Sequence, residues 1–230
     1  MKSSANLIAA GGRTARSCAS LHRRTAGFTL IELLVVIALL SVLAVVLLPA
    51  IAGARQQGDR VETQARMQHL AQAVEGYQRL KNRGYYPPDN FSNPADPEVK
   101  VKGSPDETNA GIESALLFLH QRAEGLKVFD DKEDWLRNTD DDSNVADIPL
   151  LQRKAKVEVV DAWGTPLAYF TSQSYGRVQK VKLESGEVVD VSAWKNPNSS
   201  GYLAPRGFQI ISAGPDLKFN TSDDITLPDR

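Results

Sequence analysis

A long uncharged segment near the amino terminus constrains this 230-residue chain more than any other feature. Residues 33–54 contain no charged side chain and consist mostly of leucine, valine, isoleucine and alanine. Because an α-helix rises 1.5 Å per residue, about 20 such residues cross the roughly 30 Å hydrocarbon layer of a membrane. The sequence therefore predicts a transmembrane helix. A buried core helix, a cleaved secretory signal peptide and an ordinary signal anchor are the alternatives, and the signal anchor is the strongest of them.

Charge is distributed unequally on the two sides of this segment. Residues 1–27 hold five basic side chains and no acid, which leaves 22 basic and 28 acidic residues for the rest of the chain. The positive-inside rule places residues 1–27 in the cytoplasm and the bulk of the chain across the membrane. An acidic remainder disfavours nucleic acid as a partner, since such binding needs a basic surface. The single cysteine, Cys18, excludes a disulfide scaffold.

Glu32 is the exceptional residue in the apolar region. An ionised carboxylate at that depth costs a few kcal/mol on insertion scales, so it normally has a partner. Arg23 and Arg24 lie a turn or two away in the sequence. If the chain is cut between Gly27 and Phe28, the new α-ammonium group becomes a second candidate. It lies about one helical turn from Glu32 of its own chain and meets Glu32 of a neighbour when two copies are staggered.

The sequence GFTLIE at residues 27–32, followed by the apolar run, resembles the class III signal of type IV pilins and of the pseudopilins of type II secretion systems. This resemblance implies that a prepilin peptidase cuts between Gly27 and Phe28 and methylates the new amine of Phe28. It also implies that Glu32 pairs with the amine of a neighbouring subunit during filament assembly.

The residues that follow are polar, with apolar side chains at helical spacing, and predict an amphipathic helix. Its expected apolar stripe consists of Val61, Ala65, Leu70, Ala73, Val74, Tyr77 and Leu80. We expect one long helix from Phe28 to about Arg83, broken around Pro49 to Gly58. The predicted parts of the chain are a cleaved leader at 1–27, a transmembrane and filament-core helix at 28–54, an amphipathic helix at 55–83 that packs on the globular domain, and a periplasmic globular domain at 84–230.

The globular domain is expected to combine one short helix with several strands. The helix is predicted at 112–121, and the strands at 156–160 with alternating burial, 167–171, 179–183, 188–191 and, as the last strand, 208–212. Residues 184–187 predict a hairpin turn. The pattern from Asp161 to Tyr169 resembles the start of the sheet in major pseudopilins, with Trp163 packing the sheet on the long helix. The predicted fold class is therefore α+β and pilin-like, with a long N-terminal helix packed on a small antiparallel β-sheet.

Two acidic segments are candidate cation sites. Residues 130–147 are rich in acids and are expected to form a solvated loop, with a weak cation site as the alternative. The C-terminal segment offers the oxygen-bearing side chains of Asp216, Asn220, Ser222, Asp223 and Asp224. Calcium takes six to eight oxygen ligands and tolerates irregular loops, so the residues alone leave calcium and a plain polar turn open. The segment also resembles the C-terminal calcium loop of major pseudopilins, and that resemblance implies calcium as a cofactor.

No catalytic constellation is visible in the sequence. The three histidines are dispersed, and no Ser-His-Asp spacing, zinc motif or phosphate loop is found. We therefore expect no enzyme and no catalytic or cofactor-binding residue.

The resemblance instead implies a structural role, closest to the G-type (major) pseudopilin, in which the N-terminal helix polymerises to drive export of folded proteins across the outer membrane. The alternatives are a type IV pilin or minor pilin for adhesion, motility or DNA uptake, and a signal-anchored periplasmic binding protein.

The implied partners are further copies of the chain in a helical filament, minor pseudopilins, the prepilin peptidase, an inner-membrane assembly platform, and membrane lipid before assembly. The implied location is the inner membrane as a single-pass protein, with the leader in the cytoplasm and the C-terminal domain in the periplasm, and then the pseudopilus.

Overall fold

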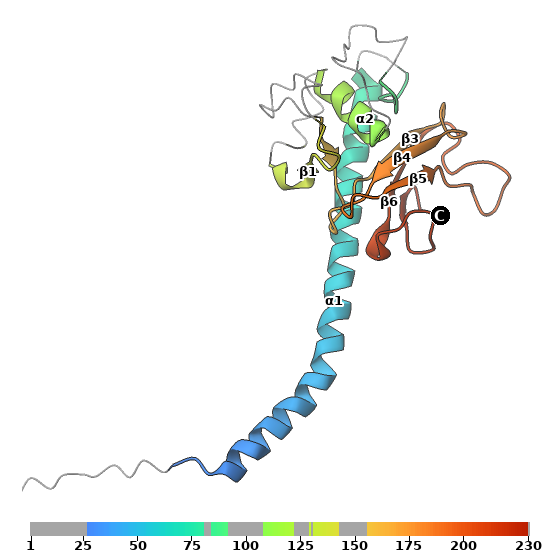
Figure 1. The fold of residues 1–230 in the computed structure, drawn as a ribbon. Helices are drawn as coiled ribbons and strands as arrows, with labels where there is room; N and C mark the ends of the chain where they lie inside the picture. The colour runs from blue at the N-terminus through green and yellow to red at the C-terminus, as the bar shows by residue number, and fades with distance from the viewer. Residues whose placement is uncertain are drawn as a thin grey trace, which may run out of the picture. The chain divides into compact units, whose positions relative to one another are not determined.

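The computed structural model describes residues 27–80, 84–91, 108–121, 129, 131–142 and 156–229. A long N-terminal helix is followed by a short helix and by antiparallel β-sheets, so the predicted α+β class is confirmed (Figure 1). The chain divides into two compact units between Leu48 and Pro49. Residues 1–26 of the predicted leader lie outside the described residues.

Helix α1 runs from Leu30 to Arg79, and Leu80 follows as a 3-10 residue. The predicted break around 49–58 is wrong, because α-helix is assigned through both Pro49 and Gly58. A single proline removes only one main-chain hydrogen bond, and the alanine-rich and long-chain residues on both sides favour helix. Residues 81–83 of the predicted helix lie outside the described residues.

The second helix and the strands are short. Helix α2 spans Ala110–Gln121, close to the prediction, and the 3-10 helices η3 and η5 span Glu133–Trp135 and Gly214–Asp216. The strands are β1 (Leu136–Arg137), β2 (Glu158–Val159), β3 (Ala168–Thr171), β4 (Val178–Lys182), β5 (Val188–Ser192), β6 (Phe208–Ser212) and β7 (Ile225–Leu227). The pairings between these strands are antiparallel: β1 with β2, β4 with β5, and β6 between β3 and β7.

The predicted hairpin is confirmed, with β4 and β5 joined by a turn in which Gly186 has a φ of 85°. The Leu183 N–H donates to the carbonyl of Glu187 at 2.8 Å and closes this turn. Two strand predictions are wrong. Strand β7 follows β6, and the segment 156–160 is buried throughout instead of alternating.

The three-stranded sheet forms the central layer of the second unit. Tyr169 and Ile210 belong to the apolar cluster that includes Leu70 of α1, whereas Phe170 and Ile211 belong to the cluster on the hairpin side. Successive side chains of a strand point to opposite faces, so a sheet covered on both faces is buried at every position. All four residues of β3 are accordingly buried.

The apolar stripe of α1 is confirmed in its later part only. Buried members are Leu70, Ala73, Val74 and Tyr77. The prediction is wrong for Val61 and Ala65, which are exposed, whereas Thr63 and Arg66 are buried.

Polar contacts to the turn after β2 explain this difference. The Ala162 N–H donates to the hydroxyl of Thr63 at 3.1 Å, and Arg66 Nη1 donates to the carbonyls of Val160 and Asp161 at 2.9 and 3.1 Å. The helix thus holds the turn through hydrogen bonds, which a hydrophobic pattern does not reveal. Trp163, in the same turn, is half-buried against the main core, as expected.

Candidate functional site

A capping box fixes the start of α1. The N–H and the hydroxyl of Thr29 each donate to Oε2 of Glu32 at 2.8 Å, and the Glu32 N–H donates back to Oγ1 of Thr29 at 3.2 Å. This reciprocal Thr-x-x-Glu arrangement satisfies N–H groups that have no partner inside the helix. The expectation of a purely cationic partner for Glu32 is therefore incomplete, since a neutral partner lies three residues away. The Thr-x-x-Glu spacing was the sequence signal that indicates it.

The capping box orients Glu32 through only one of its two carboxylate oxygens. Both Thr29 donors meet Oε2, and the described residues direct no hydrogen bond to Oε1. The side chain is exposed, and the positive end of the helix dipole favours a carboxylate in this first turn. Arg23 and Arg24, the leader residues considered as partners, lie outside the described residues.

The predicted cleavage site lies outside the helix. Gly27 and Phe28 precede the first helical residue, and both are exposed, Phe28 by 73%. A peptide bond in such a non-helical, exposed segment is accessible to a protease.

The apolar first part of α1 fits a membrane anchor. Its best 18-residue window has a mean hydropathy of 3.1, and none of that window is buried in the protein. By length and composition the helix is sufficient to cross a membrane.

Comparison with known families adds a finding on this same segment. Residues 22–48 match the family model described as the prokaryotic N-terminal methylation motif. The chain carries a type IV pilin-like signal. The type IV pilin-like signal includes Gly27, Phe28 and the capping box, and it implies processing by a prepilin peptidase and assembly into filaments. Comparisons with curated proteins and with solved structures found no match.

The residues predicted to bind calcium lie from Asp216, the last residue of η5, to Asp224, just before β7, and their carboxylates accept hydrogen bonds from N–H groups of the same loop. Oδ2 of Asp223 accepts from the Asp216 N–H at 3.2 Å, and Oδ2 of Asp224 accepts from the Asn220 N–H at 2.9 Å. The Thr221 hydroxyl, 2.6 Å from Asp223, lowers the pKa of that carboxyl, whereas burial raises the pKa of Asp224. Calcium binding by this loop stays a prediction.

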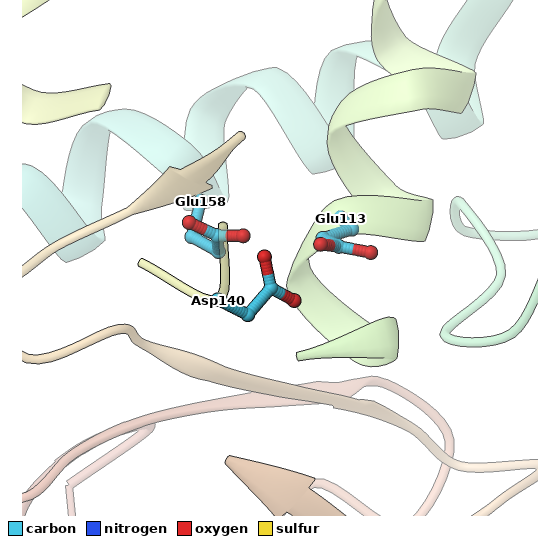
Figure 2. Close-up of side chains that lie close together, drawn as sticks. All are labelled: Glu113, Asp140 and Glu158. Carbon is cyan, nitrogen blue, oxygen red and sulfur yellow. The ribbon is translucent and has the colours of Figure 1, made fainter. Parts of the chain in front are cut away.

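A different group of carboxylates lies inside the domain, where Glu113, Asp140 and Glu158 approach one another (Figure 2). One oxygen from each lies within 4.8 Å of the others. The expectation of a solvated loop at 130–147 is wrong for Asp140 and Asp142, which are partly buried, and residues 130 and 143–147 lie outside the described residues. Sequence reasoning missed Glu113 and Glu158, because each is a single acid among apolar residues and they are far apart in the chain.

Burial dominates the electrostatics of this group. It raises the pKa of Glu113 and of Glu158, and the negative charge of Asp140 raises both further. The ammonium group of Lys156 contacts Oε2 of Glu113 and lies 3.0 Å from Oδ2 of Asp142. Lys156 therefore compensates only part of the negative charge that these carboxylates bring together.

Proposed function

We propose that the chain is a structural filament subunit and not an enzyme. In this proposal the prepilin peptidase cuts between Gly27 and Phe28, the new amine of Phe28 is methylated, and the apolar part of α1 forms the filament core. The observation that carries the proposal is the position of Glu32, which lies in the matched motif and whose side chain is oriented by two hydrogen bonds from Thr29.

The capping box and the ion pair act at different stages. In the membrane, hydrogen bonds from Thr29 reduce the cost of placing a carboxylate near hydrocarbon. They leave Glu32 anionic, and cleavage creates a cation at Phe28. A staggered neighbour brings its amine to Oε1, and the resulting pair is removed from water in the filament core, where it is strong. Repetition of this head-to-tail contact without closure produces a fibre.

Three substitutions separate the charge of Glu32 from its capping role. E32A removes both, E32Q keeps a capping acceptor but removes the charge, and T29V removes the capping hydroxyl but keeps the charge. We expect all three chains to be inserted and cut, T29V to assemble, and E32A and E32Q to fail. Filament yield from sheared cells, measured by immunoblot, tests this. Normal filaments from E32Q would contradict the ion-pair role and leave capping as the function of Glu32.

We assign the filament to a type II secretion pseudopilus, close to the G-type, with minor pseudopilins and an inner-membrane assembly platform as partners. The support is the Trp163-Gly164 turn, the acidic C-terminal segment and the absence of cysteine from residues 28–230. A deletion strain is expected to retain exported proteins in the periplasm. Loss of adhesion, motility or DNA uptake with normal export would favour a type IV pilin or minor pilin instead.

The proposed location follows from the same assignment. The leader lies in the cytoplasm, α1 crosses the inner membrane once, and the domain from residue 84 onward lies in the periplasm until assembly. A reporter fused to the C-terminus and active only in the periplasm tests this orientation.

Calcium at Asp216, Asn220, Ser222, Asp223 and Asp224 is a further part of the proposal and is supported by the sequence. D223A is expected to lower Tm only when calcium is present. An equal decrease in chelator would show that Asp223 stabilises the loop through its hydrogen bonds alone.

A further inference from the structure

The interior carboxylates come from a helix, a strand and a loop segment of the second unit (Figure 2). Glu113 lies in the first turn of α2, Glu158 lies in β2, and Asp140 follows β1. Strand pairing places Glu158 opposite Arg137, which brings the residues after β1 alongside it. Thr139 then donates its N–H to Oε2 of Glu158 at 2.8 Å. Strand pairing and a main-chain hydrogen bond therefore bring Asp140 and Glu158 close together.

Oε1 of Glu113 and Oε1 of Glu158 are both buried, and neither accepts a hydrogen bond in the described part of the chain. Glu113 is 1% exposed and Glu158 is 0% exposed. The other oxygen of each residue is occupied, by Lys156 and by Thr139. A buried carboxylate oxygen without a partner is costly, so two of them beside a third carboxylate require a positive occupant.

Two lysines contact this region, and their contacts in the described part of the chain are to other oxygens than these two. Lys156 contacts Oε2 of Glu113 and Oδ2 of Asp142. Lys182 lies 3.2 Å from the main-chain oxygen of Asp140 and 3.5 Å from Asp141. None of these contacts involves Glu158, which makes no ion pair among the described residues.

We propose that Glu113, Asp140 and Glu158 bind one divalent cation of the calcium type, which joins α2 to the β1–β2 pair. Calcium–oxygen distances of about 2.3–2.6 Å allow ligand oxygens on opposite sides of the ion to lie about 5 Å apart, whereas magnesium requires about 4 Å. One oxygen from each of these residues lies within 4.8 Å of the others, a spread that calcium accommodates. The site is separate from the C-terminal loop, and the inference does not depend on filament assembly.

The competing occupant is a shared proton. A carboxyl group of Glu158 that is protonated donates a hydrogen bond to Glu113 and satisfies both orphaned oxygens without a metal. Glutamine in place of glutamate distinguishes the two cases, because an amide N–H replaces the proton, whereas a neutral amide lacks the negative charge that attracts a divalent cation.

The test uses the full chain in detergent micelles, dialysed against chelator and titrated with calcium chloride alone by calorimetry. D223A serves as the parent, so that calcium in the C-terminal loop does not contribute. We expect the parent to bind one calcium ion and to gain roughly 5–10 °C in Tm at a hundredfold excess over Kd. E158Q added to this parent is expected to lose both effects while its Tm in chelator stays unchanged or rises. D141N is the matched control, because the side chain of Asp141 is 91% exposed, and it should bind as the parent does.

Absence of calcium binding in the D223A parent would overturn the proposal. Equal binding after E158Q would also overturn it. If D223A disturbs folding, wild type and E158Q are titrated with calcium chloride instead. The proposal predicts that E158Q binds one calcium ion fewer than wild type. An unchanged stoichiometry would overturn it.

Discussion

Gly214 lies just after β6, where the main chain of Asp223 in the C-terminal loop passes close to it. Replacement of Gly214 by alanine tests this close approach. Gly214 has a φ of 69°, in the left-handed region that glycine adopts at low cost. A Cβ at this position would overlap the main-chain oxygen of Asp223 and lie 3.1 Å from its carbonyl carbon. The obstacle is backbone, which cannot rotate away as a long side chain can.

Gly186 provides a matched control for this substitution. It also has a positive φ, 85°, but a Cβ there would meet no atom within 4 Å. Alanine at either position costs about 1 kcal/mol through left-handed strain. At Gly214 overpacking adds about 1–3 kcal/mol, so we expect G214A to destabilise the chain by roughly 2–4 kcal/mol and G186A by about 1 kcal/mol.

The free energy of unfolding of both variants can be measured by urea titration of the full chain in detergent, followed by tryptophan fluorescence. Trp194 is a suitable reporter, because its Nε1–H donates to Asp224 at 3.2 Å within the same loop. Equal losses in G214A and G186A would refute the close approach of Asp223 to Gly214 and, with it, the described conformation of the loop.

Three further substitutions test the packing of the second unit. Burial raises the pKa of Asp161 to about 6, so the stability that this group contributes is complete below the pKa of the unfolded chain, about 4, and is lost as pH rises to about 6. D161N never ionises, and its stability relative to wild type should therefore increase by up to about 3 kcal/mol between pH 4 and pH 7 in urea titrations; no change with pH would contradict this. Y169F removes the hydroxyl that donates to the carbonyl of Pro87 at 2.9 Å, and it should lower the free energy of unfolding by about 1–2 kcal/mol in the same assay. An unchanged free energy of unfolding would contradict a stabilising role of this hydrogen bond. T63V removes the acceptor of the Ala162 N–H and should cost about 1 kcal/mol, with faster amide exchange at residue 162 as the specific sign.

The sequence predicted those helices and strands that can be recognised from the pattern of neighbouring residues. The hairpin follows from two valine-containing segments around Ser185-Gly186, and α2 follows from apolar residues at helical spacing. The short strand β7 was missed, since three residues give no measurable alternation. The prediction for Val61 is wrong because the hydrogen bonds that Thr63 accepts and Arg66 donates, and not apolar packing, decide which face of α1 is covered there.

The candidate sites also differ in whether their residues are close together in the sequence. Glu32 could be identified from the sequence because its motif is contiguous, and the comparison with known families supports that motif. Its capping partner could also have been predicted from the Thr-x-x-Glu spacing. The group of Glu113, Asp140 and Glu158 could not, because strand pairing and helix packing bring these residues together from distant parts of the chain.

The central claim is that proteolysis creates at Phe28 the cation that Glu32 requires in the filament. Intact mass and N-terminal sequencing of the protein extracted from membranes of cells with an active prepilin peptidase test it most directly. The account predicts a chain that begins Phe-Thr-Leu-Ile-Glu and carries one additional methyl group on its amine. A chain that retains its leader, or one that begins at Gly53, would contradict it.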